Sequence, residues 1–135
     1  MIDPVWLDPK FLIKAHNQLI NRYGGIAGIR DYGSLDAVLA RPQQILGYSE
    51  DKNLTIFTLA AAIGWSLCRR HPFIDGNKRV SFVAVAVFLQ INGYHLDVAN
   101  REATKTMMAV ASGNTSEEKF VSWIEDNSFE TKSGL

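Results

Sequence analysis

Apolar residues recur at the spacing of an α-helix directly after the first few residues of the chain. Asp8 followed by Pro9 is typical of a helix N-cap and first helical residue, since proline suits the first turn. Gly24 and Gly25 predict the end of this helix, because glycine adopts the left-handed conformation of a C-cap at little cost. The apolar positions that recur between these signals are Phe11, Leu12, Ala15, Leu19 and Ile20.

The following segment predicts a short helix and then a loop. Ser34 can cap a helix that runs through Ala40, and Pro42 predicts its end because proline disrupts the interior of a helix. Residues 42–53 contain Pro, Gly, Ser, Asp and Asn without sustained periodicity. We therefore expect a loop there, of the kind in which contacts with partners concentrate.

Two long apolar segments predict the centre of the fold. Asn53 can cap a helix over residues 54–70, which ends before Pro72 because the residue before a proline avoids helical geometry. Residues 78–92 are apolar on nearly every side, and their length favours a buried helix over a strand. Burial of each large side chain contributes about 1.5–3 kcal/mol, so we expect these two helices to form a central hairpin.

The last third of the chain predicts two more helices. One covers residues 100–112 and ends at Gly113, and Thr115-Ser116-Glu117-Glu118 has the form of a capping box that opens a final amphipathic helix. Residues 128–135 are expected to be a flexible C-terminal tail. The prediction is an all-α fold with a single domain over residues 1–127, about six helices around the central hairpin, and the loop at residues 42–53.

Length and composition agree with one domain and narrow the range of functions. The 135 residues are 47% hydrophobic and 21% charged, which suits a packed core rather than a disordered chain. A net charge of zero argues against a general nucleic-acid binder, so no direct nucleic-acid contact is expected. The single cysteine, Cys68, excludes an intrachain disulfide and is expected in the core. We see no signal peptide, and the apolar run at 80–89 is shorter than the ~20 residues of a membrane helix, so a cytoplasmic location is expected.

The loop between the two central helices carries an unusual arrangement of charge. Basic residues are favoured at the end of a helix, as Arg69 and Arg70 are, whereas Lys78 and Arg79 place positive charge at a helix start. The backbone N–H groups at that start, together with the permissive backbone of Gly76, let an anion approach closely. A polyphosphate suits such a site.

Two further residues of this loop add chemistry. Asp75 is the one acid of the cluster and suits Mg²⁺ beside phosphates, since Mg²⁺ usually takes one or two carboxylates. His71 can act as a general base toward a hydroxyl group, because histidine titrates near neutral pH. Each residue also has a simpler interpretation. These are His71 as a packed or capping histidine, Asp75-Gly76 as a turn pair, Asn77 as a helix cap, Lys78-Arg79 as a solvated turn, and Phe73 as an apolar plug that seats the loop. A single anion-and-metal site explains the polar residues together.

The loop resembles the signature of a known family. His71-Pro72-Phe73-x-Asp75-Gly76-Asn77-x-Arg79 is similar to the signature of Fic-fold proteins, which share an all-helical core. Lys78, where adenylyl-transferring members usually have a second glycine, resembles the death-on-curing (Doc) subfamily. Ser34 departs from the apolar residue often found there in Doc-like sequences. Further blocks in family order are Arg22-Tyr23-Gly24-Gly25, Gly28-Ile29-Arg30-Asp31-x-Gly33, Ala40-Arg41-Pro42 and Asn92-Gly93-Tyr94.

The resemblance implies a Ser/Thr protein kinase that uses ATP and Mg²⁺ and acts as the toxin of a type II toxin–antitoxin system. His71 would deprotonate a hydroxyl of the target, Asp75 would hold Mg²⁺, and Lys78 implies that ATP presents its γ-phosphate. The implied target is bacterial elongation factor Tu, docked by a flap at residues 42–53, with arrest of translation and growth as the result. The residues implied to bind the ATP phosphates are Arg69, Gly76, Asn77, Lys78 and Arg79.

The same resemblance implies a protein partner. Doc-type toxins are inhibited by a Phd-type antitoxin, whose C-terminal segment folds into a groove of the toxin, and an amphipathic helix in an apolar groove is the expected mode. Many other Fic proteins carry an inhibitory helix with a Ser/Thr-x-x-x-Glu-Gly/Asn pattern, which we do not find in these residues. We therefore expect inhibition to come from another chain.

Three other functions remain open from the residues alone. The same loop could serve a Fic-type adenylyltransferase, or the chain could be a catalytically inactive module that only binds an antitoxin. A metal-dependent hydrolase is the weakest alternative, because His71 and Asp75 lack a third or fourth ligand at a suitable spacing. The other two histidines, His16 on the first helix and His95 after Gly93, receive structural interpretations.

Overall fold

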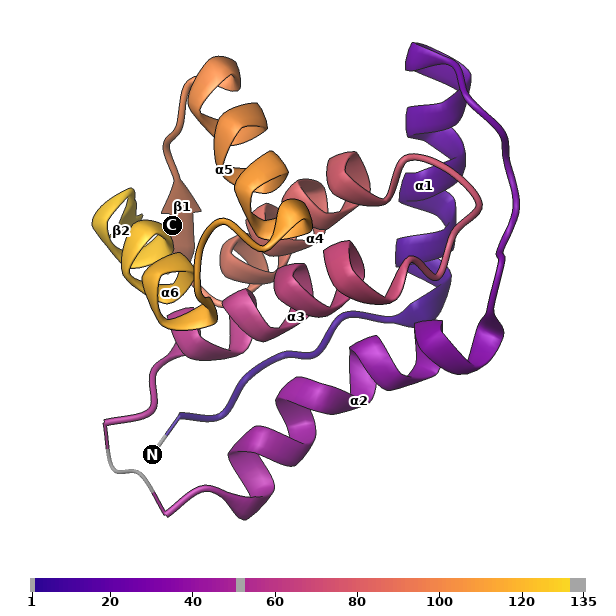
Figure 1. The fold of residues 1–135 in the computed structure, drawn as a ribbon. Coiled ribbons are helices and arrows are strands. Elements are labelled where there is room, and N and C mark those ends of the chain that lie inside the picture. The colour runs from indigo at the N-terminus through magenta and orange to yellow at the C-terminus, as the bar shows by residue number, and fades with distance from the viewer. Residues whose placement is uncertain (1, 51–52, 132–135) are drawn as a thin grey trace.

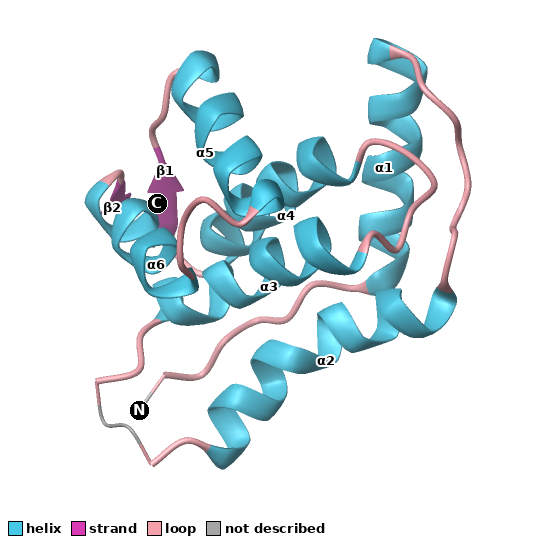
Figure 2. Cartoon of the chain, viewed as in Figure 1, coloured by secondary structure: helices cyan, strands magenta, loops and turns pink. Residues whose placement is uncertain are grey.

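Six helices and one pair of short strands make up the part of the chain that the computed structural model describes, residues 2–50 and 53–131 (Figure 1). The all-α prediction with about six helices is confirmed, with a small two-stranded sheet added at one edge (Figure 2). None of the helices among these residues has the length and apolar character needed to cross a membrane. In chain order the elements are α1 (Pro9–Tyr23), α2 (Tyr32–Tyr48), α3 (Ile56–Arg70), α4 (Asn77–Ile91), β1 (Tyr94–Leu96), α5 (Asn100–Ser112), α6 (Glu117–Asp126) and β2 (Ser128–Glu130).

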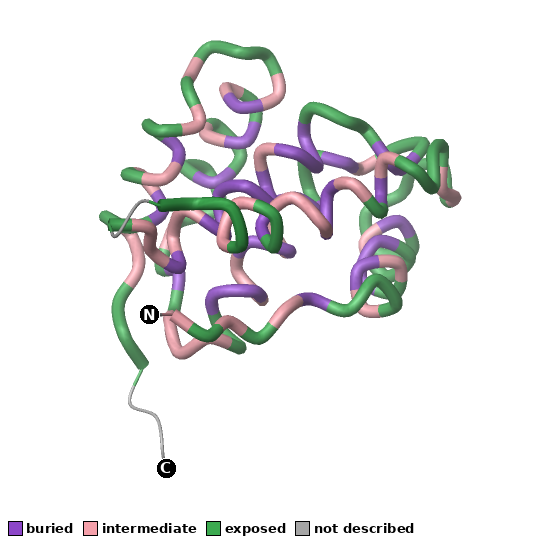
Figure 3. Tube along the Cα trace, turned by 90° about the horizontal axis from the view of Figure 1, so that it is seen from below, coloured by how far each residue is buried: buried purple, intermediate pink, exposed green. Residues whose placement is uncertain are grey.

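The hairpin of α3 and α4 lies at the centre, as predicted, and the other helices surround it (Figure 1). α3 contacts α2, α5 and α6 as well as α4, which is why its buried residues lie on all sides of the helix. Along the whole trace, buried segments alternate with exposed ones (Figure 3). α1 packs against α4 beside the loop that joins the two central helices. The hairpin therefore fixes both ends of that loop, at the end of α3 and at the start of α4.

The two central helices approach most closely at Gly64. A Cβ atom at this position would lie 2.5 Å from Val85 Cγ2 and 3.1 Å from the ring of Phe120. Ser81, on the facing turn of α4, donates a hydrogen bond from its hydroxyl to the Gly64 carbonyl at 2.7 Å. Glycine in the interior of α3 thus permits the close contact that sets the spacing of the hairpin.

The predicted end of the second helix at Pro42 is wrong, since α2 continues to Tyr48. Proline removes one backbone hydrogen bond from a helix, but Pro42 is buried with Leu35, Val38 and Leu39, and this packing holds the helix together. Of the loop expected over residues 42–53, residues 42–48 are helical and residues 51–52 lie outside the described part.

Several predicted caps are shifted by one to three residues. α2 is capped by Asp31, whose carboxylate accepts from the backbone N–H of Ser34 at 3.1 Å, and this hydrogen bond is the main cause of the lowered pKa of Asp31. Thr55, not Asn53, caps α3 in a capping box with Thr58. Ser116 caps α6 by accepting from the Lys119 N–H, so the box expected between Thr115 and Glu118 does not form. These shifts leave every predicted helix in place.

The expected flexible tail is replaced over its first residues by a strand. β2 pairs antiparallel with β1, in a register that places Tyr94 opposite Glu130 and Leu96 opposite Ser128. The tail prediction is therefore wrong for residues 128–130, and residues 132–135 lie outside the described part.

Candidate active site

His71 follows the last residue of α3 and begins the loop that the sequence singles out. Its backbone is left-handed, with φ 49° and ψ 58°, and among the described residues it is the one non-glycine residue with positive φ. This conformation costs roughly 1–2 kcal/mol in a residue with a Cβ atom, so surrounding contacts must hold it. The side chain is exposed, as a general base that meets a substrate requires.

Arg30 supplies one of these contacts. Its guanidinium donates to the carbonyl of His71 at 2.7 Å from Nε and to the carbonyl of Arg70 at 2.6 Å from Nη2. The last carbonyls of a helix carry partial negative charge, so a cation that bonds them stabilises the helix end. Arg30 therefore holds the backbone of His71 from outside the helix.

The segment around Arg30 also pairs with the loop through its backbone. The N–H groups of Arg30 and Asp31 donate to the Pro72 carbonyl at 2.7 and 3.1 Å, and Ile74 donates to the Gly28 carbonyl at 3.1 Å. An isolated antiparallel bridge between Ile29 and Phe73 lies between them. The sequence block at residues 28–31 is thus a brace for the loop, a role that its local pattern does not reveal.

Phe73 seats the loop in the core, as predicted. Its side chain is 1% exposed, and its ring stacks on the ring of His16 with centroids 3.8 Å apart and an interplanar angle of 9°. Asn77 closes the loop on the same residue: its side-chain oxygen accepts from the Phe73 N–H and its amide donates to the Phe73 carbonyl, both at 3.0 Å. Asn77 is neither the cap of α4, a place that Gly76 takes, nor directed at solvent. Its part in phosphate binding stays a prediction.

The carboxylate of Asp75 is exposed and held by two backbone N–H groups. Oδ1 accepts from Gly76 at 2.8 Å and Oδ2 accepts from Ile26 at 3.2 Å. Gly25 is needed for this approach, because its φ is +121° and a Cβ atom there would lie 2.8 Å from Oδ2. A carboxylate has about four lone-pair sites, so two remain for a cation after these bonds.

This arrangement fits Mg²⁺ only together with a substrate. Among the described residues, no three His, Cys, Asp or Glu side chains are grouped so that they could hold a metal ion. Mg²⁺ commonly keeps several waters and binds one or two carboxylates plus substrate phosphates, so Asp75 alone is a sufficient protein ligand. The donor set thus suits a metal that arrives with a nucleotide.

The start of α4 offers a surplus of positive charge. No side chain caps its first turn, and Gly76 precedes it in the left-handed conformation. Lys78 and Arg79 are exposed, and in the described part of the chain no carboxylate forms an ion pair with either. Arg79 lies over the ring of Tyr23 at 4.5 Å from the centroid, a contact that orients its guanidinium. Uncapped N–H groups beside two free cations are suited to bind phosphate oxygens.

Arg69 lies in the last turn of α3, before the loop. It packs over Trp65 at 5.4 Å and donates to the Val110 carbonyl at 3.4 Å, near the end of α5. Its guanidinium thus lies at the C-terminal end of α5, and its predicted contact with the phosphates stays a prediction.

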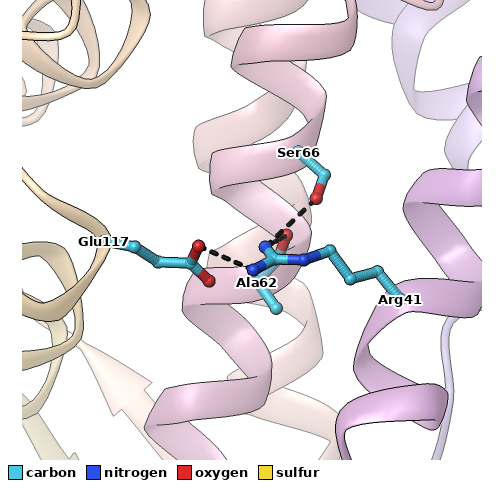
Figure 4. A network of polar contacts seen from close by, with 4 residues as sticks. All are labelled: Arg41, Ala62, Ser66 and Glu117. Atoms are coloured by element: carbon cyan, nitrogen blue, oxygen red, sulfur yellow. Dashed lines mark hydrogen bonds and ion pairs between the residues drawn. The ribbon is translucent and has the colours of Figure 1, made fainter.

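Arg41, which belongs to the block Ala40-Arg41-Pro42, links α2 to α3 and α6 through polar contacts (Figure 4). Its Nη2 forms an ion pair with Glu117 at 2.7 Å, while Nη1 donates to the Ala62 carbonyl at 3.5 Å and to the Ser66 hydroxyl at 3.4 Å. The contacts join α2, α3 and α6, so the role of Arg41 is to fix the frame of the hairpin.

The predicted site residues therefore fall into two groups. The loop and the first turn of α4 hold His71, Asp75, Gly76, Lys78 and Arg79, while Asn77 is turned inward and Arg69 outward toward α5. Sequence reasoning missed His16 and Arg30. A polar residue on the apolar face of α1 was the one available signal for His16.

Comparison with known proteins identifies the family of this chain. The model of the Fic/DOC family matches residues 6–89, a span that includes the brace, the loop and most of α4. The chain belongs to the Fic/DOC family. One Fic/DOC relative, "Toxin Doc" of Mycolicibacterium smegmatis, is 46% identical over 74 residues, which cover 55% of this chain and 56% of that protein. "Protein kinase doc" of Escherichia phage P1 is 36% identical over 87 residues, or 64% of this chain and 68% of the relative.

A solved Fic-fold structure extends the likeness over the whole fold. The crystal structure of BepC, a VirB-translocated Bartonella effector protein from Bartonella tribocorum with bound AMPPNP, superposes with a TM-score of 0.61. The match covers 97% of this chain and 79% of the BepC chain at 18% identity. At that identity the likeness concerns the fold alone.

Proposed function

We propose that this Fic/DOC-family chain is a Doc-type toxin that transfers the γ-phosphoryl group of ATP to a Ser or Thr hydroxyl of a protein. The observation that carries the proposal is the start of α4, where an uncapped helix end, Lys78 and Arg79 adjoin the carboxylate of Asp75. The family and the relatives named as a Doc toxin and a Doc protein kinase support it.

The chemistry assigned to the protein is proton transfer and charge stabilisation. His71, held by Arg30, takes the proton of the target hydroxyl while the new bond from that oxygen to the γ-phosphorus forms. The bond from the γ-phosphorus to the bridging oxygen breaks, and ADP leaves. Mg²⁺, held by Asp75, would neutralise charge on the phosphates. The N–H groups of the first turn of α4, together with Lys78 and Arg79, stabilise the charge that spreads over the transferred group.

Lys78 is the reason to prefer phosphoryl over adenylyl transfer. Its side chain is exposed at the first turn of α4, where a glycine would leave the backbone open to the α-phosphate. A long cation there adds bulk and charge, and this supports a nucleotide that enters with its γ-phosphate toward His71. The α-phosphate then lies farther from the nucleophile.

We further propose elongation factor Tu as the target and a Phd-like antitoxin as the inhibitor, both as the resemblance implies. The flap that docks the target would begin after Tyr48, since residues before it are helical. The domain would extend through β2 rather than end at residue 127.

The test is incubation of the protein with elongation factor Tu, Mg²⁺ and ATP labelled at either the α- or the γ-phosphate. We expect label to remain on the factor only from the γ position, and none with the His71→Ala variant. Label from the α position would identify an adenylyltransferase instead. Growth arrest by the His71→Ala variant equal to that of the parent would contradict catalysis by this residue and support an inactive binding module.

A further inference from the structure

His16 is a buried histidine that the proposed chemistry does not use. It lies on α1, 59 residues before Asp75 in sequence, and its side chain is 1% exposed. An apolar side chain would fill the same space without the cost of burying a polar ring, which is roughly 1–3 kcal/mol when no hydrogen bond compensates it. The hydrogen-bond partner of the buried ring therefore indicates the role of His16.

That partner is the backbone of the catalytic loop. Nε2 of His16 lies 2.7 Å from the carbonyl oxygen of Asp75. A carbonyl oxygen only accepts, so Nε2 must carry the hydrogen, and the contact fixes this tautomer of the ring.

The bonded carbonyl belongs to the same peptide unit that holds the carboxylate. The unit between Asp75 and Gly76 is planar, so an anchor on its C=O also fixes the direction of its N–H. That N–H, from Gly76, donates to Oδ1 of Asp75 at 2.8 Å. His16 thus orients the Asp75 carboxylate through one rigid peptide group.

The ring of His16 has a second contact that is separable from the first. It stacks in parallel on Phe73, whose side chain is equally buried, and so fills the space beneath the loop. A phenylalanine at position 16 would keep this stacking and remove the donor. A glutamine would keep a donor at similar reach and remove the ring.

We propose that His16 is a positioning residue for the Mg²⁺ ligand Asp75, and that it acts through its hydrogen bond to the Asp75 carbonyl. The proposal rests on the proposed function in assigning Mg²⁺ to Asp75. Loss of a residue that orients a metal ligand typically costs about 10–100-fold in metal affinity or activity.

The experiment compares His16→Phe and His16→Gln with the parent and with His95→Phe, a control at an exposed histidine of β1. Mn²⁺ titration by electron paramagnetic resonance in the presence of AMPPNP measures metal affinity, and kinetics give kcat and the KM for ATP. We expect His16→Phe to weaken Mn²⁺ binding by about tenfold or more. The KM for ATP changes less, and His16→Gln and the control stay close to the parent. A folded His16→Phe variant with parental Mn²⁺ affinity would overturn the proposal.

Two NMR measurements test the hydrogen bond between His16 and the Asp75 carbonyl independently of activity. In the parent, we expect the His16 ring to carry its hydrogen on Nε2, and hydrogen exchange at the Gly76 amide to be faster in His16→Phe than in the parent. A hydrogen on Nδ1 alone, or unchanged Gly76 exchange, contradicts the proposal even if the protein transfers no phosphoryl group. Should His16→Phe not fold, the ring tautomer and a His16→Gln variant with parental Mn²⁺ affinity support the proposal, and a folded His16→Gln variant that loses this affinity overturns it.

Discussion

Replacement of Gly64 by alanine tests the close approach of α3 and α4, on which the position of the catalytic loop depends. In an open helical position the change would be favourable by about 0.8–1.0 kcal/mol, the difference in helix propensity between the two residues. Here the added methyl group would lie 2.5 Å from Val85 Cγ2 and 3.1–3.3 Å from two ring atoms of Phe120. Carbon atoms pack without strain at about 3.5–4.0 Å, so these neighbours would have to move.

The neighbours have little room to do so. Val85 and Phe120 are each 1% exposed and come from two different helices, α4 and α6. Overpacking of a tight core costs about 1–3 kcal/mol, and a contact this short belongs at the upper end of the range. Set against the gain in propensity of about 1 kcal/mol, we expect Gly64→Ala to lower the free energy of unfolding by about 2 kcal/mol.

Urea denaturation followed by circular dichroism measures this change as a lower midpoint at unchanged m-value. Gly47→Ala in α2 is the matched control, because a Cβ atom there meets no atom within 4 Å. We expect the control to raise stability by up to about 1 kcal/mol. If Gly64→Ala were as stabilising as Gly47→Ala, the two central helices would not be in close contact at this point.

Three further predictions concern the brace, the frame and the core. Arg30→Ala removes the support of the His71 backbone and should lower kcat about 10- to 100-fold with little change in the KM for ATP. The control variant Arg22→Ala should have the kcat of the parent, and an Arg30→Ala variant with parental kcat would refute the role of Arg30 as a brace. The side chains of Arg41 and Glu117 are 35% and 26% exposed, so a double-mutant cycle followed by urea denaturation should give a coupling energy of about 0.2–1 kcal/mol. A coupling energy of zero would mean that this ion pair does not stabilise the packing of α2 and α6 on α3. Burial raises the pKa of the Cys68 thiol and disfavours the reactive thiolate, so iodoacetamide at pH 8 should label this residue only on unfolding; rapid labelling of the native protein would contradict its burial.

The helices that the sequence predicts well have strong local signals. α1 has a cap, a proline and a terminal glycine at the expected positions, and all three take those roles. The sequence predicts both ends of α5, at Asn100 and Ser112. In α2, by contrast, the local rule for Pro42 is overridden by packing against α3, which no local pattern reports. The strands β1 and β2 have three residues each, too few for an alternating pattern, and they pair across more than 30 residues of chain.

The candidate site also combines residues with a local sequence signal and residues that come from distant parts of the chain. His71, Asp75, Lys78 and Arg79 lie close together in sequence, and the conflict of Lys78 and Arg79 with the preferences of a helix start is visible without a structure. Arg30 and His16 reach the loop from 40 and 59 residues away, and each bonds a backbone carbonyl. Every residue type has a backbone carbonyl, so the sequence of the loop does not indicate that Arg30 or His16 bonds to it. His16 therefore resembles a core residue until α1 is placed beside the loop.

Intact mass spectrometry of elongation factor Tu after incubation with this protein, ATP and Mg²⁺ tests the central claim most directly. We expect the mass of the factor to rise by one phosphoryl group, and we expect no gain with the His71→Ala variant. A gain of one adenylyl group would contradict the orientation of ATP inferred from Lys78, and an unchanged mass with active protein would contradict this target.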